Sequence, residues 1–227
     1  MRMKPSGRFG CLALIIFAGL SALAGQPVRN YSDKTIAQLM SLLESSDATE
    51  RHCAAIFIGD RYRNPKANVI NGPTHKPNSP APEFPIPSRV IPALTAHLQT
   101  DGDWRVRACA LGALRDLRFH TNTTPSVALA LNDKDTLVRI RACSALIDIS
   151  HDYSESLHTD VIPTLVCCLD PKGEVEQLLQ AAYAAEQLGV QGVGVVPALR
   201  TLKHHDSPKV KHYAERALKQ IEKTAKK

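Results

Sequence analysis

Similar apolar segments recur along this chain at long intervals. Four apolar segments carry a proline near their start, and the prolines are 33, 38 and 34 residues apart. Leucines or valines follow at helical spacing, as Leu94 and Leu98 do. Proline fits the first turn of a helix, where its missing N–H would have no intrahelical partner. The pattern predicts a first helix, helix A, in four repeats, which start around Pro92, Pro125, Pro163 and Pro197.

A second pattern follows each proline. An acidic residue precedes an apolar residue and a basic residue, and alanines stand four and seven positions after the apolar residue. That spacing places the alanines on one helical face, where small side chains let helices approach closely. The leading aspartate is a favourable N-cap. The pattern predicts a second helix, helix B, after Asp103, Asp135 and Asp206.

Two further copies are degenerate. The first runs from Asp47 to Ala54, and Ala37 stands in the proline position of its helix A. The other has Leu179 in place of the basic residue, and Gly189 is expected to end its helix B. The whole pattern predicts an all-α chain of about five antiparallel helix pairs.

The recurring Asp-x-x-Val-Arg-x-x-Ala core with a preceding proline resembles the HEAT-repeat family, in the style of the bilin-lyase-type HEAT proteins. The resemblance extends from Ser32 to Glu222, apart from one insertion. It implies an α-solenoid of the armadillo type, an α–α superhelix of stacked helix pairs, with helices B lining the concave face. Proteins of this family mostly bind other proteins.

One position of helix B is basic in four copies. Arg51, Arg107, Arg139 and Lys211 occupy it, and each has an acid four or five residues earlier. A basic ladder would receive an acidic partner, whereas an Asp–Arg ladder resembles the one that tethers HEAT repeats to each other. The second interpretation, in which these charges stabilise the stacked repeats, is favoured. Candidate partner-binding residues are these four, together with Trp104 and Phe84.

Residues 60–88 interrupt the repeats. Seven prolines lie between Asn64 and Ser88, so a continuous helix is excluded there. The segment is either a surface linker or a recognition segment, for which Phe84 and Ile86 are the apolar anchors. The expected divisions of the chain are 1–24 (signal peptide), 25–59 (degenerate repeat), 60–88 (proline-rich insertion), 89–222 (repeats) and 223–227 (basic tail).

The N-terminus has the pattern of a secretory signal. Basic residues precede the apolar run Cys11–Ala22, and Ala22-Leu23-Ala24 fits a cleavage site before Gly25. A membrane anchor would need about 20 apolar residues, more than this run provides. We therefore expect cleavage between Ala24 and Gly25, a periplasmic or extracellular protein, and no stable membrane span after cleavage.

The net charge bears on the class of partner, and the cysteines bear on disulfide and zinc sites. The chain carries +6, and residues 1–24 contain three basic and no acidic residues, so cleavage leaves +3. This mild charge does not favour nucleic acid. Five cysteines remain (Cys53, Cys109, Cys143, Cys167 and Cys168) without a zinc-type spacing. Buried thiols are favoured, and one disulfide is the alternative that export leaves open.

The sequence contains no strong catalytic, metal-binding or cofactor-binding motif. The nine histidines form no His-x-x-x-His pair of the zinc-protease type, and no His-Glu dipeptide occurs as in the HEAT-repeat hydroxylases. The glycines between Gly189 and Gly194 follow a predicted helix rather than a strand, which argues against a dinucleotide site. The sequence predicts an exported, non-catalytic scaffold without cofactor that binds a protein. The alternative is a bilin-lyase-type enzyme or a module for a small molecule or metal.

Overall fold

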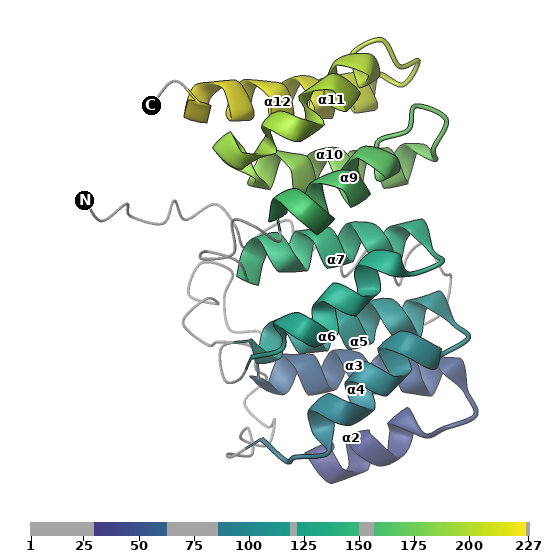
Figure 1. Cartoon of the computed structure of the whole chain (residues 1–227). Helices are drawn as coiled ribbons and strands as arrows, with labels where there is room; N and C mark the ends of the chain where they lie inside the picture. The colour runs from purple at the N-terminus through teal and green to yellow at the C-terminus, as the bar shows by residue number, and fades with distance from the viewer. Residues whose placement is uncertain (1–29, 63–85, 119–121, 150–156, 226–227) are drawn as a thin grey trace. The chain divides into compact units, whose positions relative to one another are not determined.

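The computed structural model describes residues 30–62, 86–118, 122–149 and 157–225 (Figure 1). No strand occurs within these ranges. The predicted signal segment with its cleavage site at Ala24 and Gly25, and Phe84 of the insertion, lie outside them. The chain divides into two compact units, Met1–Thr123 and Thr124–Lys227, which are described separately.

Within the described ranges, the N-terminal unit, unit 1, contains two helix pairs, and the C-terminal unit contains three. Helix α2 (Ile36–Leu43) packs on α3 (Ala48–Tyr62), and α4 (Val90–Thr100) packs on α5 (Trp104–Leu117). The two B helices, α3 and α5, lie side by side. A capping box starts α2, because Thr35 accepts from the Gln38 N–H and the Gln38 side chain accepts from the Thr35 N–H.

The C-terminal unit, unit 2, contains three pairs. Helix α6 (Thr124–Leu129) continues into the 3₁₀ turn η2 (Ala130–Asn132), and both pack on α7 (Thr136–Ile149). The π-helical turn η3 (Leu157–Val161) leads into α9 (Ile162–Cys168), which contacts α10 (Val175–Gln187). The 3₁₀ segment η4 (Gly189–Val195) leads into α11 (Val196–Leu202), which packs on α12 (Pro208–Ala225).

The helix pairs match the predicted repeats. Pro163 and Pro197 stand in the first turns of α9 and α11. Gly189 follows the end of α10 at a φ of 54°, a left-handed conformation that glycine adopts without steric cost. Asp206 was expected to cap the last helix, but α12 begins at Pro208, so Ser207 is the residue before it.

Two helix ends differ from the expected divisions. Helix α3 continues to Tyr62, so the first three residues of the range 60–88 are helical. Helix α12 continues to Ala225 and therefore includes the start of the range 223–227. Tyr62 lies four residues after Ile58 and is buried, so the apolar face of α3 itself continues into the range 60–88.

The alanines of the repeat motif lie where helices pack closely, as their small side chains allow. Each is at most 2% exposed, namely Ala54, Ala110, Ala113, Ala142, Ala145, Ala182, Ala185, Ala214 and Ala217. Helices α3 and α5 approach each other closely, because a Cβ on Gly59 would lie 2.9 Å from the Ala113 Cα. Leu39, Leu43, Ile58 and Leu114 complete the core of this unit.

The cysteines lie mostly inside the units. Cys53, Cys109, Cys143 and Cys168 are buried as expected, whereas Cys167 is exposed, and no disulfide joins any two of the described cysteines. Burial raises the pKa of the Cys143 and Cys168 thiols. These two thiols are therefore poor nucleophiles.

Candidate interaction surface

The three arginines of the repeated basic position make the same contact. In each, Nη1 donates to the backbone carbonyls six and five residues earlier, in the turn between helices A and B. For Arg51 the distances to the Ser45 and Ser46 oxygens are 2.8 and 3.0 Å. For Arg107 the distances to the Asp101 and Gly102 oxygens are 2.9 and 3.4 Å. Arg139 bonds Asp133 and Lys134 at 2.8 and 3.2 Å.

The aspartate of the motif caps the helix that follows it. The carboxylates of Asp47, Asp103 and Asp135 each accept from the N–H two residues later, at 2.8, 2.8 and 2.9 Å. They cap their own helices, as expected for N-cap aspartates. The basic residue and the acid of one repeat therefore stabilise the two ends of the same turn.

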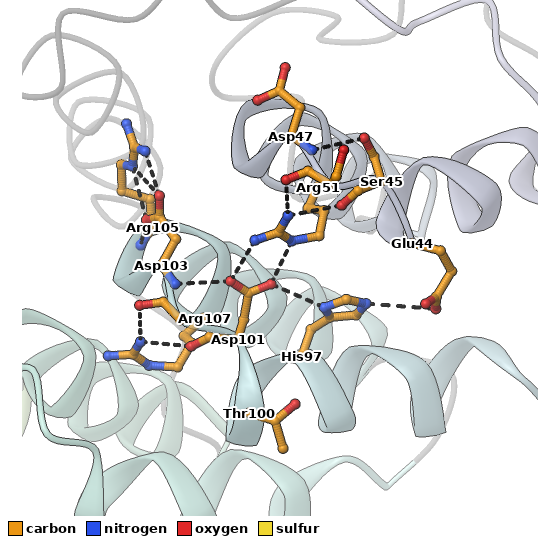
Figure 2. Close-up of polar contacts among 12 residues, drawn as sticks. Glu44, Ser45, Asp47, Arg51, His97, Thr100, Asp101, Asp103, Arg105 and Arg107 are labelled. Atoms are coloured by element: carbon orange, nitrogen blue, oxygen red, sulfur yellow. Dashed lines mark hydrogen bonds and ion pairs between the residues drawn. The ribbon is translucent and has the colours of Figure 1, made fainter.

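Arg51 also reaches the next repeat (Figure 2). Its Nε and Nη2 donate to the two carboxylate oxygens of Asp101 at 2.7 and 3.0 Å. The Asp101 side chain is 3% exposed and that of Arg51 is 17% exposed. This bidentate pair tethers α3 to the turn before α5, so the ladder between repeats exists here through Asp101 rather than through Asp47.

Two further groups meet the same carboxylate. His97 Nδ1 lies 3.2 Å from Asp101 Oδ2, and its Nε2 lies 3.8 Å from the Glu44 carboxylate. The Asp103 N–H donates to Asp101 Oδ1 at 2.9 Å. Burial by itself raises the pKa of Asp101, but the hydrogen bonds from Arg51, Asp103 and His97 hold this pKa below its ordinary value of 3.8.

A neighbouring pair reinforces the start of α5. Arg105 donates from Nε to both carboxylate oxygens of Asp103 at 3.0 and 3.1 Å, and its Nη2 bonds the same group. These bonds lower the pKa of Asp103 below its ordinary value, against the opposing effect of burial. The polar groups of unit 1 in Figure 2 thus satisfy one another and the backbone.

The predicted partner-binding residues occupy different environments. Arg107 is 2% exposed, so its guanidinium lies inside the unit. Arg139 and Trp104 are partly exposed, and Lys211 is exposed. Partner binding through this repeated position stays a prediction. The contacts of its arginines include those with the turns and with Asp101, and Arg139 also donates from Nη2 to the Thr136 hydroxyl at 3.0 Å.

A different group of residues projects from the B helices of unit 2. Arg216 of α12 donates from Nε to both carboxylate oxygens of Glu186 of α10 at 3.1 and 3.0 Å. The Arg216 guanidinium lies 5.0 Å from the centre of the Tyr213 ring, and the His212 ring lies edge-on to the same tyrosine at 6.0 Å. Burial, Asp148 and Glu186 raise the pKa of nearby Tyr183, so this phenol stays protonated.

These side chains are ordered and still reachable from solvent. The Arg216 side chain is 39% exposed, Tyr183 and Tyr213 are partly exposed, and His212 is exposed. The repeat pattern did not single them out, because they vary between copies. The signal that could have found them is the i, i+3 spacing of Tyr213 and Arg216 on a helix whose apolar face is fixed by Val210, Ala214 and Ala217.

Within the described ranges, no group of three or more His, Cys, Asp or Glu side chains is placed to hold a metal ion. No described helix is long and apolar enough to span a bilayer.

Comparison with known proteins identifies the architecture. Neither a family model nor a curated protein matches the chain. Solved structures do match. The complex of CpcE and CpcF of phycocyanin lyase from Nostoc sp. has a TM-score of 0.53 at 21% identity, over 87% of this chain and 69% of that one. A designed armadillo repeat protein in complex with the peptide (KR)4 has a TM-score of 0.56 at 15% identity, over 95% and 96%.

The chain has a HEAT/armadillo-type repeat fold. An engineered protein matches it as well, with a TM-score of 0.51 and 20% identity over 91% of this chain and 88% of that one. The all-α solenoid class expected from the repeats is thereby confirmed. At these identities the HEAT/armadillo-type neighbours establish the fold, and function has to be argued from the surface.

Proposed function

We propose that this HEAT/armadillo-type chain is an exported, non-catalytic scaffold that binds a protein partner through the B-helix surface of α10 and α12. The observation that carries the proposal is the cluster of Tyr183, Tyr213 and Arg216. Tyrosine and arginine dominate binding hot spots, since they offer large contact areas with a polar end. The ion pair to Glu186 and the stacking on Tyr213 hold Arg216 in place before a partner arrives, which reduces the entropy lost on binding.

The architecture supports this use. Stacked helix pairs present neighbouring B helices as an extended surface. Among the structural neighbours, the designed armadillo repeat protein is in complex with a peptide. We carry this mode of binding over to the present chain as part of the proposal.

Export is the second part of the proposal, and it rests on the N-terminal sequence. Basic residues, an apolar run and Ala22-Leu23-Ala24 support cleavage before Gly25 and a periplasmic or extracellular location. N-terminal sequencing of the protein isolated from its source tests this directly. A mature protein that begins at Gly25 supports export, whereas an intact N-terminus in the cytoplasmic fraction contradicts it.

The binding surface is tested by affinity capture with residues 25–227, using extract of the native compartment and mass spectrometry. A variant with Tyr183→Ala and Tyr213→Ala removes both rings, and the matched variant with Tyr183→Phe and Tyr213→Phe keeps them. We expect one specific protein to be captured by the wild-type and phenylalanine forms and lost from the alanine form. Capture that is equal in all three forms places the contact elsewhere. Capture with a chain that lacks residues 64–88 shows how much the proline-rich insertion contributes to partner binding.

A bilin-lyase-type enzyme is the second candidate, and the likeness to the CpcE–CpcF complex of phycocyanin lyase favours it. This candidate predicts that the purified protein takes up a bilin and shows visible absorbance. A protein that stays colourless after incubation with bilin, and that contains no metal by elemental analysis, argues for the scaffold.

A further inference from the structure

The last helix carries a row of basic residues. Lys209, His212, Arg216, Lys219 and Lys223 follow each other at intervals of three, four, three and four residues. At 100° per residue these five side chains fall within about 80° of arc on α12. We call this row the basic stripe. Glu215 and Glu222 lie outside this arc, on the side of the helix that also carries Lys211, so the stripe itself contains no acidic residue of α12.

The basic stripe faces away from the core. Val210, Ala214, Ala217, Leu218 and Ile221 form the buried face of α12. Lys209, His212, Lys219 and Lys223 are exposed, and Arg216 is held at the centre by Glu186 and Tyr213. A solvated helix face with i, i+4 ion pairs would mix both signs along one row. The stripe instead keeps the acids to one side, which suits a partner of opposite charge.

The spacing indicates the form of that partner. Lys209, Arg216 and Lys223 stand seven residues apart, which is about 10.5 Å along a helix. A peptide in the extended polyproline II conformation has three residues per turn and rises about 3.1 Å per residue, so every third side chain returns to the same face after about 9 Å. Carboxylates at every third position of such a segment therefore match every second member of the stripe, namely Lys209, Arg216 and Lys223.

A membrane surface fits this row less well. None of the five stripe side chains is apolar, and the apolar face of α12 is buried in unit 2. Binding at a membrane interface needs an exposed apolar face beside the charges. The tyrosines at the edge of the stripe add contact area suited to a polypeptide.

We propose that the basic stripe of α12, with Tyr183 and Tyr213 beside it, recognises an extended acidic segment of the partner protein. This inference rests on the proposed protein-binding function and adds the chemistry of the ligand. The repeated position with Arg51, Arg107 and Arg139 contributes to the turns instead, so the acidic ligand is placed on another row of side chains than the one the repeat pattern suggested.

The test uses residues 25–227 and a fluorescein-labelled peptide of repeated Glu-Ser-Gly, about nine residues long so that its extended form covers the stripe. Fluorescence anisotropy gives the affinity at low and at physiological salt. The stripe variant combines Lys209→Glu, Lys219→Glu and Lys223→Glu and leaves Arg216 intact. The matched control combines Lys134→Glu, Lys172→Glu and Lys203→Glu, which are exposed lysines of unit 2 outside the stripe and give the same change in net charge.

We expect the peptide to bind the wild type, to bind the stripe variant at least about tenfold more weakly, and to bind the control within about twofold. Salt should weaken the wild-type complex, because exposed charges are screened. A Lys-Ser-Gly peptide should not bind. Equal losses in the two variants, or no binding to the wild type, overturn the inference. Equally tight and equally stripe-dependent binding of a short DNA duplex overturns it in favour of a general polyanion surface.

The capture experiment separates this inference from the proposed function. A captured protein that is lost with Tyr183→Ala and Tyr213→Ala but retained by the stripe variant leaves the scaffold function standing and overturns the acidic ligand. Circular dichroism of each variant confirms that the helices are intact. Loss of the same captured protein from the stripe variant, with retention by the control, supports both.

Discussion

The two units build the same repeat with different kinds of contact. In unit 1, a buried carboxylate, Asp101, receives Arg51 and His97 and joins two repeats. In unit 2, the charged pair between α10 and α12, Arg216 with Glu186, lies partly in solvent beside two tyrosines. Buried pairs contribute to stability through the cost of leaving one partner unsatisfied, whereas exposed pairs contribute little. The comparison shows that the Asp101 network of unit 1 is internal, whereas the Arg216 pair of unit 2 remains open to solvent, as the proposed binding surface requires.

The largest expected effect comes from removing the buried carboxylate. Asp101→Ala leaves the guanidinium of Arg51, 17% exposed, without its main partner, and we expect unit 1 to lose about 3 kcal/mol. Trp104, the single tryptophan, lies in α5, so urea unfolding followed by its fluorescence reports on unit 1. The control is Glu44→Ala in the same network, where the side chain is 75% exposed, and it should cost less than about 0.5 kcal/mol. Equal losses in both variants would remove the contrast between the units.

The next effect concerns helix spacing. In Gly59→Ala the new methyl would lie 2.9 Å from the Ala113 Cα, and backbone cannot move aside easily, so we expect a loss of about 2 kcal/mol. Gly102→Ala has nothing within 4 Å and serves as the control. In unit 2, Gly194→Ala would meet the Ile162 Cγ2 at 2.8 Å, a side-chain atom that can shift, so its cost should be below that of Gly59→Ala. Unfolding followed by circular dichroism compares the three.

The pH dependence of unit 1 sharpens the comparison further. The folded state holds the pKa values of Asp101 and Asp103 below the 3.8 of the unfolded chain, so the unfolded chain binds more protons in acid. The stabilisation is therefore complete above about pH 5 and is lost as the pH falls through the lowered folded values. Acid titration of the Trp104 fluorescence should show this decline. The double variant Asp101→Asn, Asp103→Asn should show a shallower decline, and Glu44→Gln should follow the wild type.

The smallest effect is expected at the exposed pair of unit 2. Glu186→Gln keeps the shape of the side chain and removes its charge, and we expect a loss of stability below about 1 kcal/mol, because Arg216 is 39% exposed. Circular dichroism during urea unfolding measures this. The amount of captured partner should fall clearly although the protein stays folded, because Arg216 loses the group that positions it. A stability loss as large as that of Asp101→Ala would show that unit 2 depends on its charges as unit 1 does.

Local patterns in the sequence determined the architecture. The period of the prolines, the alanines at the fourth and seventh positions, and Gly189 after α10 predict helix pairs, because each depends on neighbours along one helix. The same local information identified Asp47, Asp103 and Asp135 as helix caps, and the side-chain bonds confirm them. The expected divisions at residues 60 and 223 fall within helices, because α3 continues to Tyr62 and α12 continues to Ala225.

Only the tertiary structure decided which charged groups meet. Asp101 is 50 residues from Arg51 and Glu186 is 30 residues from Arg216, distances at which the sequence pattern carries no pairing information. The repeated arginine position was visible in the sequence, but the groups that these arginines bind were not. The sequence pattern is the same whether a guanidinium binds a turn carbonyl, a neighbouring repeat or a partner. Packing selected among these by burying Arg107 and leaving the basic stripe of α12 in solvent. The sequence specified the repeat, and the stacking of the repeats determined which of its charges are internal and which remain available to a partner.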